Sequence, residues 1–126
     1  AVAENNIGGI IAIIEKSNFK IIALKMLLVE TKLAKEHYKE HINKPFFKEL
    51  VEFITSGPSV AIILEGQDCI KNLRDLVGNT NPAKAVQGTI RTKFGVDVGR
   101  NAVHASDSSE AAIREIDLFF NTSEIY

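Results

Sequence analysis

Apolar residues recur along the chain with two periods, and the two periods predict strands alternating with helices. Residues 20–29 are apolar on both alternating sides, with Ile21 and Ala23 on the same side. This pattern predicts a strand covered on both faces. Residues 59–65 (SVAIILE) predict a second strand, because they form a short apolar run between turn residues.

Helices are predicted in the other regular segments. Isoleucines at i, i+3, i+4 and i+7 predict a helix from Ile7 to about Lys16. Thr31 can begin a polar helix that runs to about Glu40, and Pro45 breaks the chain after it. Three more helices are predicted by apolar stripes at helical spacing. Their members are Phe46, Phe47, Leu50, Val51 and Ile54; Ile70, Leu73, Leu76 and Val77; and Ala112, Ile113, Ile116, Phe119 and Phe120.

The stretch from residue 79 to residue 99 differs from the rest of the chain. It begins after Gly78, where the preceding helix is predicted to end, and it has no sustained period. A connection of about twenty irregular residues is uncommon inside a compact domain and is usually functional when it is ordered. We therefore expect this stretch to contribute to a functional site.

Length and composition predict one domain, residues 1–126, and exclude several classes of protein. Fifteen Lys plus Arg against sixteen Asp plus Glu give a net charge of −1, which offers no general attraction for nucleic acid. The single cysteine, Cys69, cannot form an internal disulfide, which favours a reducing, cytoplasmic compartment. Apolar runs such as residues 10–14 are too short to cross a bilayer, so no membrane partner is expected. Ala1 is not preceded by a signal peptide and does not resemble a natural start.

Two features that resemble functional motifs carry little weight. His37 and His41 match the H-x-x-E-H pattern of some zinc peptidases, because histidines at i and i+4 share a helix face. Their surroundings are highly polar and no third ligand is evident nearby, so the pattern favours a solvated helix face and no metal site is predicted. Cys69 is interpreted as a small helix residue rather than a nucleophile.

The most informative segment runs from Asn101 to Ser108 (NAVHASDS), where the irregular stretch meets the last predicted helix. His104 is followed there by the hydroxyl of Ser106 and the carboxylate of Asp107, beside a helix N-terminus. Imidazole titrates near neutral pH and helix N–H groups attract anions, so the segment favours nucleophilic or acid–base chemistry. A structural interpretation stays open, because Asp107 or Ser108 also suits the cap of the helix.

The chain strongly resembles the nucleoside diphosphate kinase family over essentially its whole length. The active-site signature of the family, N-x-x-H-[G/A]-S-D, corresponds here to residues 101–107 (NAVHASD). The other family motifs, in order and at the expected spacing, are residues 44–47 (KPFF), 56–58 (SGP), 78–83 (GNTNPA), 88–91 (GTIR) and 114–116 (REI). So long a collinear set of motifs is far more specific than any single one.

The resemblance implies an α+β fold with a ferredoxin-like antiparallel sheet, in the order βαββαβ, covered by helices. It also implies ping-pong transfer of the γ-phosphate of a nucleoside triphosphate, usually ATP, to a nucleoside diphosphate. His104 would attack through Nδ1 and become a phosphohistidine, while Glu115 would hydrogen-bond the other ring nitrogen and orient the imidazole. Mg²⁺ is expected to arrive with the nucleotide, bound to phosphate oxygens.

The resemblance also assigns roles to residues around this histidine. Tyr38 and Ser106 match the tyrosine and the serine that lie close to it. Phosphate transfer needs preorganised donors, and stacking on a ring suits an enzyme that accepts many bases. The nucleotide-binding positions are Arg74, Thr80 and Arg91 for the phosphates, Phe46 for stacking on the base, Leu50 and Val98 for apolar contacts with it, and Asn101 for the ribose 3′-hydroxyl.

One segment of the family pattern is absent from the chain. The family begins with a strand that ends in Lys-Pro-Asp just before the residues that match Ala1 and Val2, and its lysine contacts the phosphates. We therefore expect the given chain to lack the first strand of the sheet, as a fragment would. A true truncation is expected to lower activity sharply, because a phosphate donor and a central strand are lost.

The resemblance further implies a homo-oligomer, either a tetramer or a hexamer. The leading prediction is therefore a nucleoside diphosphate kinase. A noncatalytic nucleotide-binding or assembly module of the same fold is the alternative, and a His104→Ala protein separates the two. Nucleic-acid binding, which relatives are reported to show, gains no support from the near-neutral charge.

Overall fold

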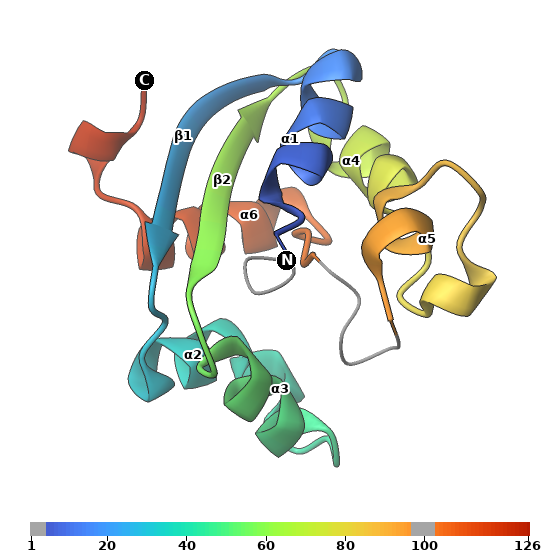
Figure 1. Ribbon diagram of the computed structural model, residues 1–126. Helices are drawn as coiled ribbons and strands as arrows, with labels where there is room; N and C mark the ends of the chain where they lie inside the picture. The colour runs from blue at the N-terminus through green and yellow to red at the C-terminus, as the bar shows by residue number, and fades with distance from the viewer. Residues whose placement is uncertain (1–4, 97–102) are drawn as a thin grey trace.

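A two-stranded antiparallel sheet lies at the centre of the computed structural model, which describes residues 5–96 and 103–126. Strand β1 (Lys20–Leu27) pairs with β2 (Ser59–Glu65), with Lys20 opposite Glu65 and Leu27 opposite Ser59. Figure 1 shows the two strands as a curved ribbon with helices around it. Both predicted strands are confirmed, although β1 ends two residues before the predicted end at residue 29.

An irregularity in β1 between Ile21 and Ala23 decides which side chains face which layer of helices. Ile21 packs with Ile10 and Ile14, whereas Ala23 belongs to the cluster on the opposite face. One extra residue in a strand reverses the alternation of its side chains. The carbonyl of that residue, Ile22, accepts a hydrogen bond from the Tyr126 N–H at 2.7 Å. The prediction that Ile21 and Ala23 share one side is therefore wrong.

Two helices cover the first face of the sheet. α1 (Ile7–Lys16) and α4 (Cys69–Val77) bring Ile10, Ile14 and Val77 into one buried cluster, against partly buried strand residues. The positions three and four residues apart in α1 lie on the same helix face, as predicted. Burial of these side chains is the main stabilising contribution of this layer.

The opposite face and one end of the sheet are covered by three other helices. α6 (Ser109–Phe119) lies across the second face, and its stripe continues into the buried ring of Phe120. α2 (Thr31–His37) and α3 (Phe47–Ile54) pack together at the end of the sheet (Figure 1). The buried cluster at that end contains Val29, Ala34 and Val51.

The irregular stretch after α4 contains two short helical pieces. The first is the 3₁₀ helix η2 (Pro82–Lys84), and the second is α5 (Ile90–Phe94). Gly78 begins the stretch with a φ of 94°, and a Cβ on it would lie 2.6 Å from the Thr89 hydroxyl. Since a side chain there meets both strain and a clash, glycine lets α4 and α5 approach closely. Thr89 then caps α5 by accepting from the Thr92 N–H.

Three predictions about the helices need correction. The helix predicted from Thr31 to Glu40 ends at His37, and a 3₁₀ turn, η1 (Lys39–His41), follows it. Phe46 precedes α3 and is 44% exposed rather than part of its buried stripe. Ile113 on α6 is 65% exposed, because the helix turns that side away from the sheet. Of the two proposed caps of α6, Ser108 is the one that accepts from the Ala111 N–H.

The prediction that β1 is covered on both faces is also wrong. Leu24, Met26 and Leu28 are all at least half exposed, because the α1 and α4 cluster packs only against the other end of this face. The antiparallel pair with helices on both sides agrees with the predicted α+β, ferredoxin-like class. Within the described residues, the sheet contains two strands of that order, β1 and β2. Within the described ranges, no helix is long and apolar enough to cross a membrane.

Candidate active site

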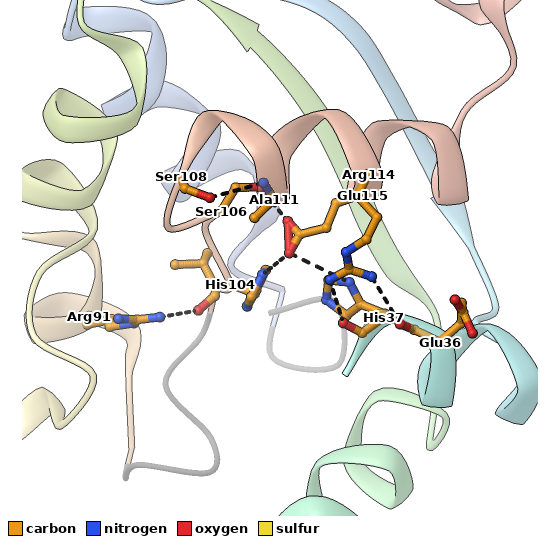
Figure 2. A network of polar contacts seen from close by, with 10 residues as sticks. Glu36, His37, Arg91, His104, Ser106, Ser108, Ala111, Arg114 and Glu115 are labelled. Atoms are coloured by element: carbon orange, nitrogen blue, oxygen red, sulfur yellow. Dashed lines mark hydrogen bonds and ion pairs between the residues drawn. The ribbon is translucent and has the colours of Figure 1, made fainter. Parts of the chain in front are cut away.

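His104 lies just before α6, and α6 supplies the carboxylate that holds it. His104 Nε2 lies 3.0 Å from Glu115 Oε1, and Ser106 donates its hydroxyl hydrogen to Glu115 Oε2. Figure 2 shows the carboxylate between these two side chains. The His104 side chain is 45% exposed, whereas that of Glu115 is 13% exposed. The structure therefore brings three of the predicted catalytic residues together, with the histidine open to solvent and its carboxylate covered.

The charge on Glu115 fixes the tautomer of His104. Burial opposes ionisation of the carboxyl, but hydrogen bonds from His104 and Ser106 and the nearby histidine charges outweigh it and lower the pKa of Glu115 to about 2. An ionised carboxylate only accepts hydrogen bonds, so Nε2 of His104 must be the donor. In a neutral imidazole the lone pair then lies on Nδ1. The geometry thus leaves Nδ1 as the nucleophilic or basic nitrogen.

His37 is a member of this site that sequence reasoning missed. Its ring lies 4.7 Å from the ring of His104 in an edge-on arrangement, and its Nδ1 lies 3.9 Å from Glu115 Oε1. His37 is only 6% exposed and also packs edge-on against Phe119. Burial and the charge of His104 lower the pKa of His37 to about 4, so the ring is neutral at neutral pH. The i, i+4 spacing suggested His41 as its partner, and no sequence pattern links it to His104.

Arg114 joins α6 to the end of α2 and so fixes His37 relative to Glu115. Its two terminal nitrogens donate to the Glu36 carbonyl at 3.1 Å and to the His37 carbonyl at 3.4 Å (Figure 2). The last carbonyls of a helix lack partners within the helix and carry partial negative charge. A guanidinium satisfies both, which explains how residues so far apart in sequence form one site.

Acid is expected to destabilise the fold through this cluster. The folded pKa of His37 is about 4 against 6.5 for the free side chain, so the unfolded chain binds a proton that the folded chain excludes. The free energy of unfolding should therefore fall by on the order of 1–3 kcal/mol between about pH 6.5 and 4. Glu115, with a folded pKa of about 2 against 4.5, adds a further loss below about pH 4.5.

Urea unfolding measured at intervals from pH 7 to 4 checks this expectation. His37→Gln should flatten the dependence between pH 6.5 and 4.5, since glutamine binds no proton in either state. An unchanged slope in the variant would show that other groups carry the effect.

Two arginines on the nucleotide side of the predicted site approach each other. Arg91 is buried, and its terminal nitrogens donate to the Gly78 carbonyl at 3.1 Å and to the Val103 carbonyl at 2.9 Å. Burial and the charge of Arg74 lower the pKa of Arg91. Arg91 therefore holds the segment next to His104, whereas Arg74, on α4, and Thr80, after α4, are exposed.

A row of aromatic rings runs from His104 to the start of α3. The Tyr38 ring lies 6.1 Å from that of His104, the His41 ring lies 6.4 Å from that of Tyr38, and the Phe46 ring lies 5.7 Å from that of His41. Burial raises the pKa of Tyr38, which keeps its hydroxyl protonated. Phe46 has an exposed ring, and Leu50 lies one turn further along α3, half-buried. The two remaining predicted positions, Val98 and Asn101, lie outside the described residues.

The same cluster holds a set of metal-ligating atoms. One donor atom each from His37, His104 and Glu115 lies within 4.8 Å of the others. His37 is the one histidine of the H-x-x-E-H motif in this set, and its other two members come from elsewhere in the chain.

An exposed imidazole with one nitrogen held by a covered carboxylate is the arrangement of a nucleophilic or acid–base enzyme. Comparison with known proteins defines the class further. The sequence profile described as nucleoside diphosphate kinase matches residues 1–125. The chain therefore belongs to the nucleoside diphosphate kinase family.

Individual relatives agree with this assignment. A nucleoside diphosphate kinase from Archaeoglobus fulgidus is 56% identical over 94% of this chain and 79% of its own length. One from Methanothermobacter thermautotrophicus is 54% identical over 99% of this chain and 83% of its own. The solved Aquifex aeolicus enzyme superposes with a TM-score of 0.96 at 43% identity, over 99% of this chain and 91% of the other. These similarities confirm the predicted family and fold class and support nucleoside diphosphate kinase activity over a noncatalytic module.

Proposed function

We propose that the chain transfers the γ-phosphate of a nucleoside triphosphate to a nucleoside diphosphate through a phosphohistidine at Nδ1 of His104. The observation that carries this proposal is the 3.0 Å contact between His104 Nε2 and the Glu115 carboxylate. That contact leaves the lone pair on Nδ1, in a side chain that is 45% exposed. A nucleophile fixed in tautomer and open to substrate meets the requirement for covalent catalysis.

In the first half-reaction, the Nδ1 lone pair of His104 forms a bond to the γ-phosphorus. The bond between that phosphorus and the bridging oxygen breaks, and the nucleoside diphosphate leaves with its electron pair. The ring gains positive charge in this step, and the ionised Glu115 stabilises it through the Nε2 hydrogen bond. In the second half-reaction, an oxygen of the acceptor's β-phosphate attacks, and the phosphorus–nitrogen bond breaks to restore the neutral ring.

The roles of the other predicted residues follow from their surroundings. Ser106 helps to hold Glu115, and Tyr38 lies beside the reacting ring with its hydroxyl protonated. Arg74 and Arg91 approach each other at a cost in electrostatic energy, which an anionic phosphate chain between them would relieve. The nucleoside would be bound by Phe46, Leu50, Val98 and Asn101. The structure of the Halobacterium salinarum nucleoside diphosphate kinase, with a TM-score of 0.95 and 42% identity over 99% of this chain and 84% of the other, is a complex with CDP.

Mg²⁺ fits this site as a partner of the nucleotide rather than of the protein. Glu115 is the carboxylate that contacts His104, and His104 and Ser106 already use both its oxygens. Mg²⁺ prefers an octahedral set of oxygens and is commonly bound through substrate phosphates. Bound in this way, the ion neutralises developing charge on the phosphate oxygens.

Three further parts of the proposal concern the protein as a whole. Residues 1–126 would form one kinase domain. The exposed side chains of Leu24, Met26 and Leu28 give the domain apolar surface, which supports assembly into a tetramer or a hexamer. The single, unpaired Cys69 supports a cytoplasmic location for the protein, because cysteines stay reduced there.

Steady-state kinetics test the two-step mechanism. With ATP as donor and a nucleoside diphosphate as acceptor, double-reciprocal plots at several acceptor concentrations should be parallel, because donor product leaves before acceptor binds. Intersecting lines would contradict the phosphohistidine route and favour direct transfer between two bound nucleotides.

Arg74→Ala is expected to weaken nucleotide binding about tenfold, mainly as a higher KM, because one charge-assisted phosphate contact is lost. The matched control is Lys71→Ala, which removes an exposed cation from the same helix that is paired with Asp75 at 2.9 Å. Initial rates against ATP concentration provide the measurement. Equal KM values in the two variants would remove Arg74 from the phosphate site.

A further inference from the structure

Three side chains from different parts of the chain aim their donor atoms at one point beside the reacting histidine. His37 comes from the end of α2, His104 from the segment before α6, and Glu115 from α6 itself (Figure 2). Glu115 Oε1 lies 3.0 Å from His104 Nε2 and 3.9 Å from His37 Nδ1. The three donor atoms lie within 4.8 Å of one another.

The Nδ1 atom of His37 is the observation that phosphoryl transfer does not explain. It is buried, has no hydrogen-bond partner among residues 5–96 and 103–126, and belongs to a side chain that is only 5% exposed. A buried polar atom without a partner costs about 1–3 kcal/mol, so an uncompensated one suggests that a ligand belongs there. Glu115 Oε1 lies 3.9 Å from it, too far for a hydrogen bond but suitable for a shared ion.

The chemistry of the three donors selects the class of ion. Two imidazole nitrogens and one carboxylate oxygen are the protein ligands of many zinc sites that keep a fourth position open. Bond lengths of about 2.0–2.2 Å in a tetrahedron place the donors about 3.3–3.5 Å apart. The two separations from Glu115 Oε1, 3.0 Å and 3.9 Å, lie on either side of that range. Mg²⁺ would not compete well, because it requires oxygen ligands.

We propose that a zinc-class divalent transition ion binds His37, His104 and Glu115 and thereby blocks phosphoryl transfer. Binding moves the single imidazole proton of His104 from Nε2 to Nδ1 by exchange with solvent, and the lone pair that this leaves on Nε2 bonds the metal. Nδ1 then carries the proton and has no lone pair to attack the γ-phosphorus, while the Glu115 carboxylate neutralises the metal. The binding site stands on geometry alone, whereas its inhibitory effect rests on the proposed function of His104.

Zinc chloride titrated calorimetrically into the full chain, in chelator-free buffer without nucleotide, tests the binding. One zinc ion per chain is expected, and His37→Gln should weaken binding about tenfold or more, because one of three ligands is lost. The matched controls are His41→Gln and Cys69→Ser. The first removes the neighbouring histidine, whose buried Nδ1 has no partner in the described part of the chain, and the second removes the thiol. Both controls should bind zinc like the wild type. Loss of binding in either control, with binding retained in His37→Gln, would overturn the site.

Diffraction from zinc-soaked crystals of the unaltered chain decides the matter even if His37→Gln fails to fold. An anomalous peak at the zinc edge is expected among His37, His104 and Glu115. A peak at Cys69 or His41, or no ordered peak, would contradict the proposal.

The inhibitory effect has its own readout. Zinc should slow transfer by the wild type, excess chelator should restore it, and the fractional inhibition should be at least about tenfold less sensitive to zinc in His37→Gln. Zinc that occupies the site without slowing transfer would overturn the inhibition. Failure of the kinase proposal itself is distinguishable, because unimpaired transfer by a His104→Ala protein would reveal it without any zinc.

Discussion

Replacing His104 by alanine is expected to lower the rate of phosphoryl transfer by on the order of 10⁴-fold or more, because no other group in the described site replaces a nucleophilic nitrogen. The loss should appear in kcat and in kcat/KM together. Phe46 and the two arginines do not depend on the imidazole, so binding of nucleoside diphosphate should persist. The measurement is the steady-state rate with ATP and an acceptor diphosphate.

Stability provides the control for this variant. The His104 side chain is 45% exposed, so its removal should change the free energy of unfolding little. A folded His104→Ala protein that still transfers phosphate at a tenth of the wild-type rate would contradict the proposed mechanism. Normal nucleotide binding with unchanged transfer would assign the function to a different nucleophile.

Glu115→Gln is the second change with a large expected effect. The amide has nearly the shape of the carboxylate but no charge, so it neither fixes the His104 tautomer nor stabilises the ring when positive charge develops. We expect kcat to fall by about 10²-fold or more, while the KM for ATP changes much less. His104 and Ser106 each use one oxygen of Glu115, and the change replaces one of these two acceptors with an NH₂ donor.

Glu110→Gln is the matched control, since it neutralises an exposed carboxylate in the first turn of the same helix. It should leave kcat within about twofold of the wild type, because surface substitutions have small effects. If the two variants lose equal activity, the loss is caused by the change in the net charge of α6 and not by loss of the contact between Glu115 and His104.

Local pattern was sufficient to predict most elements of the fold. The spacing of the isoleucines predicted the helix α1, the apolar run predicted the strand β2, and both elements form in the structure. The faces of β1 were mispredicted because an irregularity beside Ile22 reverses the alternation of its side chains. The N–H group that bonds the Ile22 carbonyl belongs to Tyr126, at the other end of the chain, so no local pattern indicates it.

The site was partly predictable for a related reason. His104 and Ser106 stand close together in one motif, and the resemblance to the family supplied Glu115 as their partner. His37 could not be found in this way, since its place beside Glu115 depends on Arg114 joining α6 to α2. The local motif instead paired His37 with His41, whose ring contacts those of Tyr38 and Phe46. Arg91 was predicted to bind phosphate, and its hold on the Val103 carbonyl is a second role that spacing does not reveal.

The central claim is that His104 carries the phosphoryl group, and the intact mass of the protein tests it most directly. The mass is measured before and after brief incubation with ATP and Mg²⁺, with no acceptor present, for the wild type and for His104→Ala. The wild type should gain one phosphoryl group that is lost in acid or on addition of a nucleoside diphosphate, and the variant should gain none. Folded wild-type protein that binds nucleotide but gains no mass, or a variant that gains the same mass, would contradict the account.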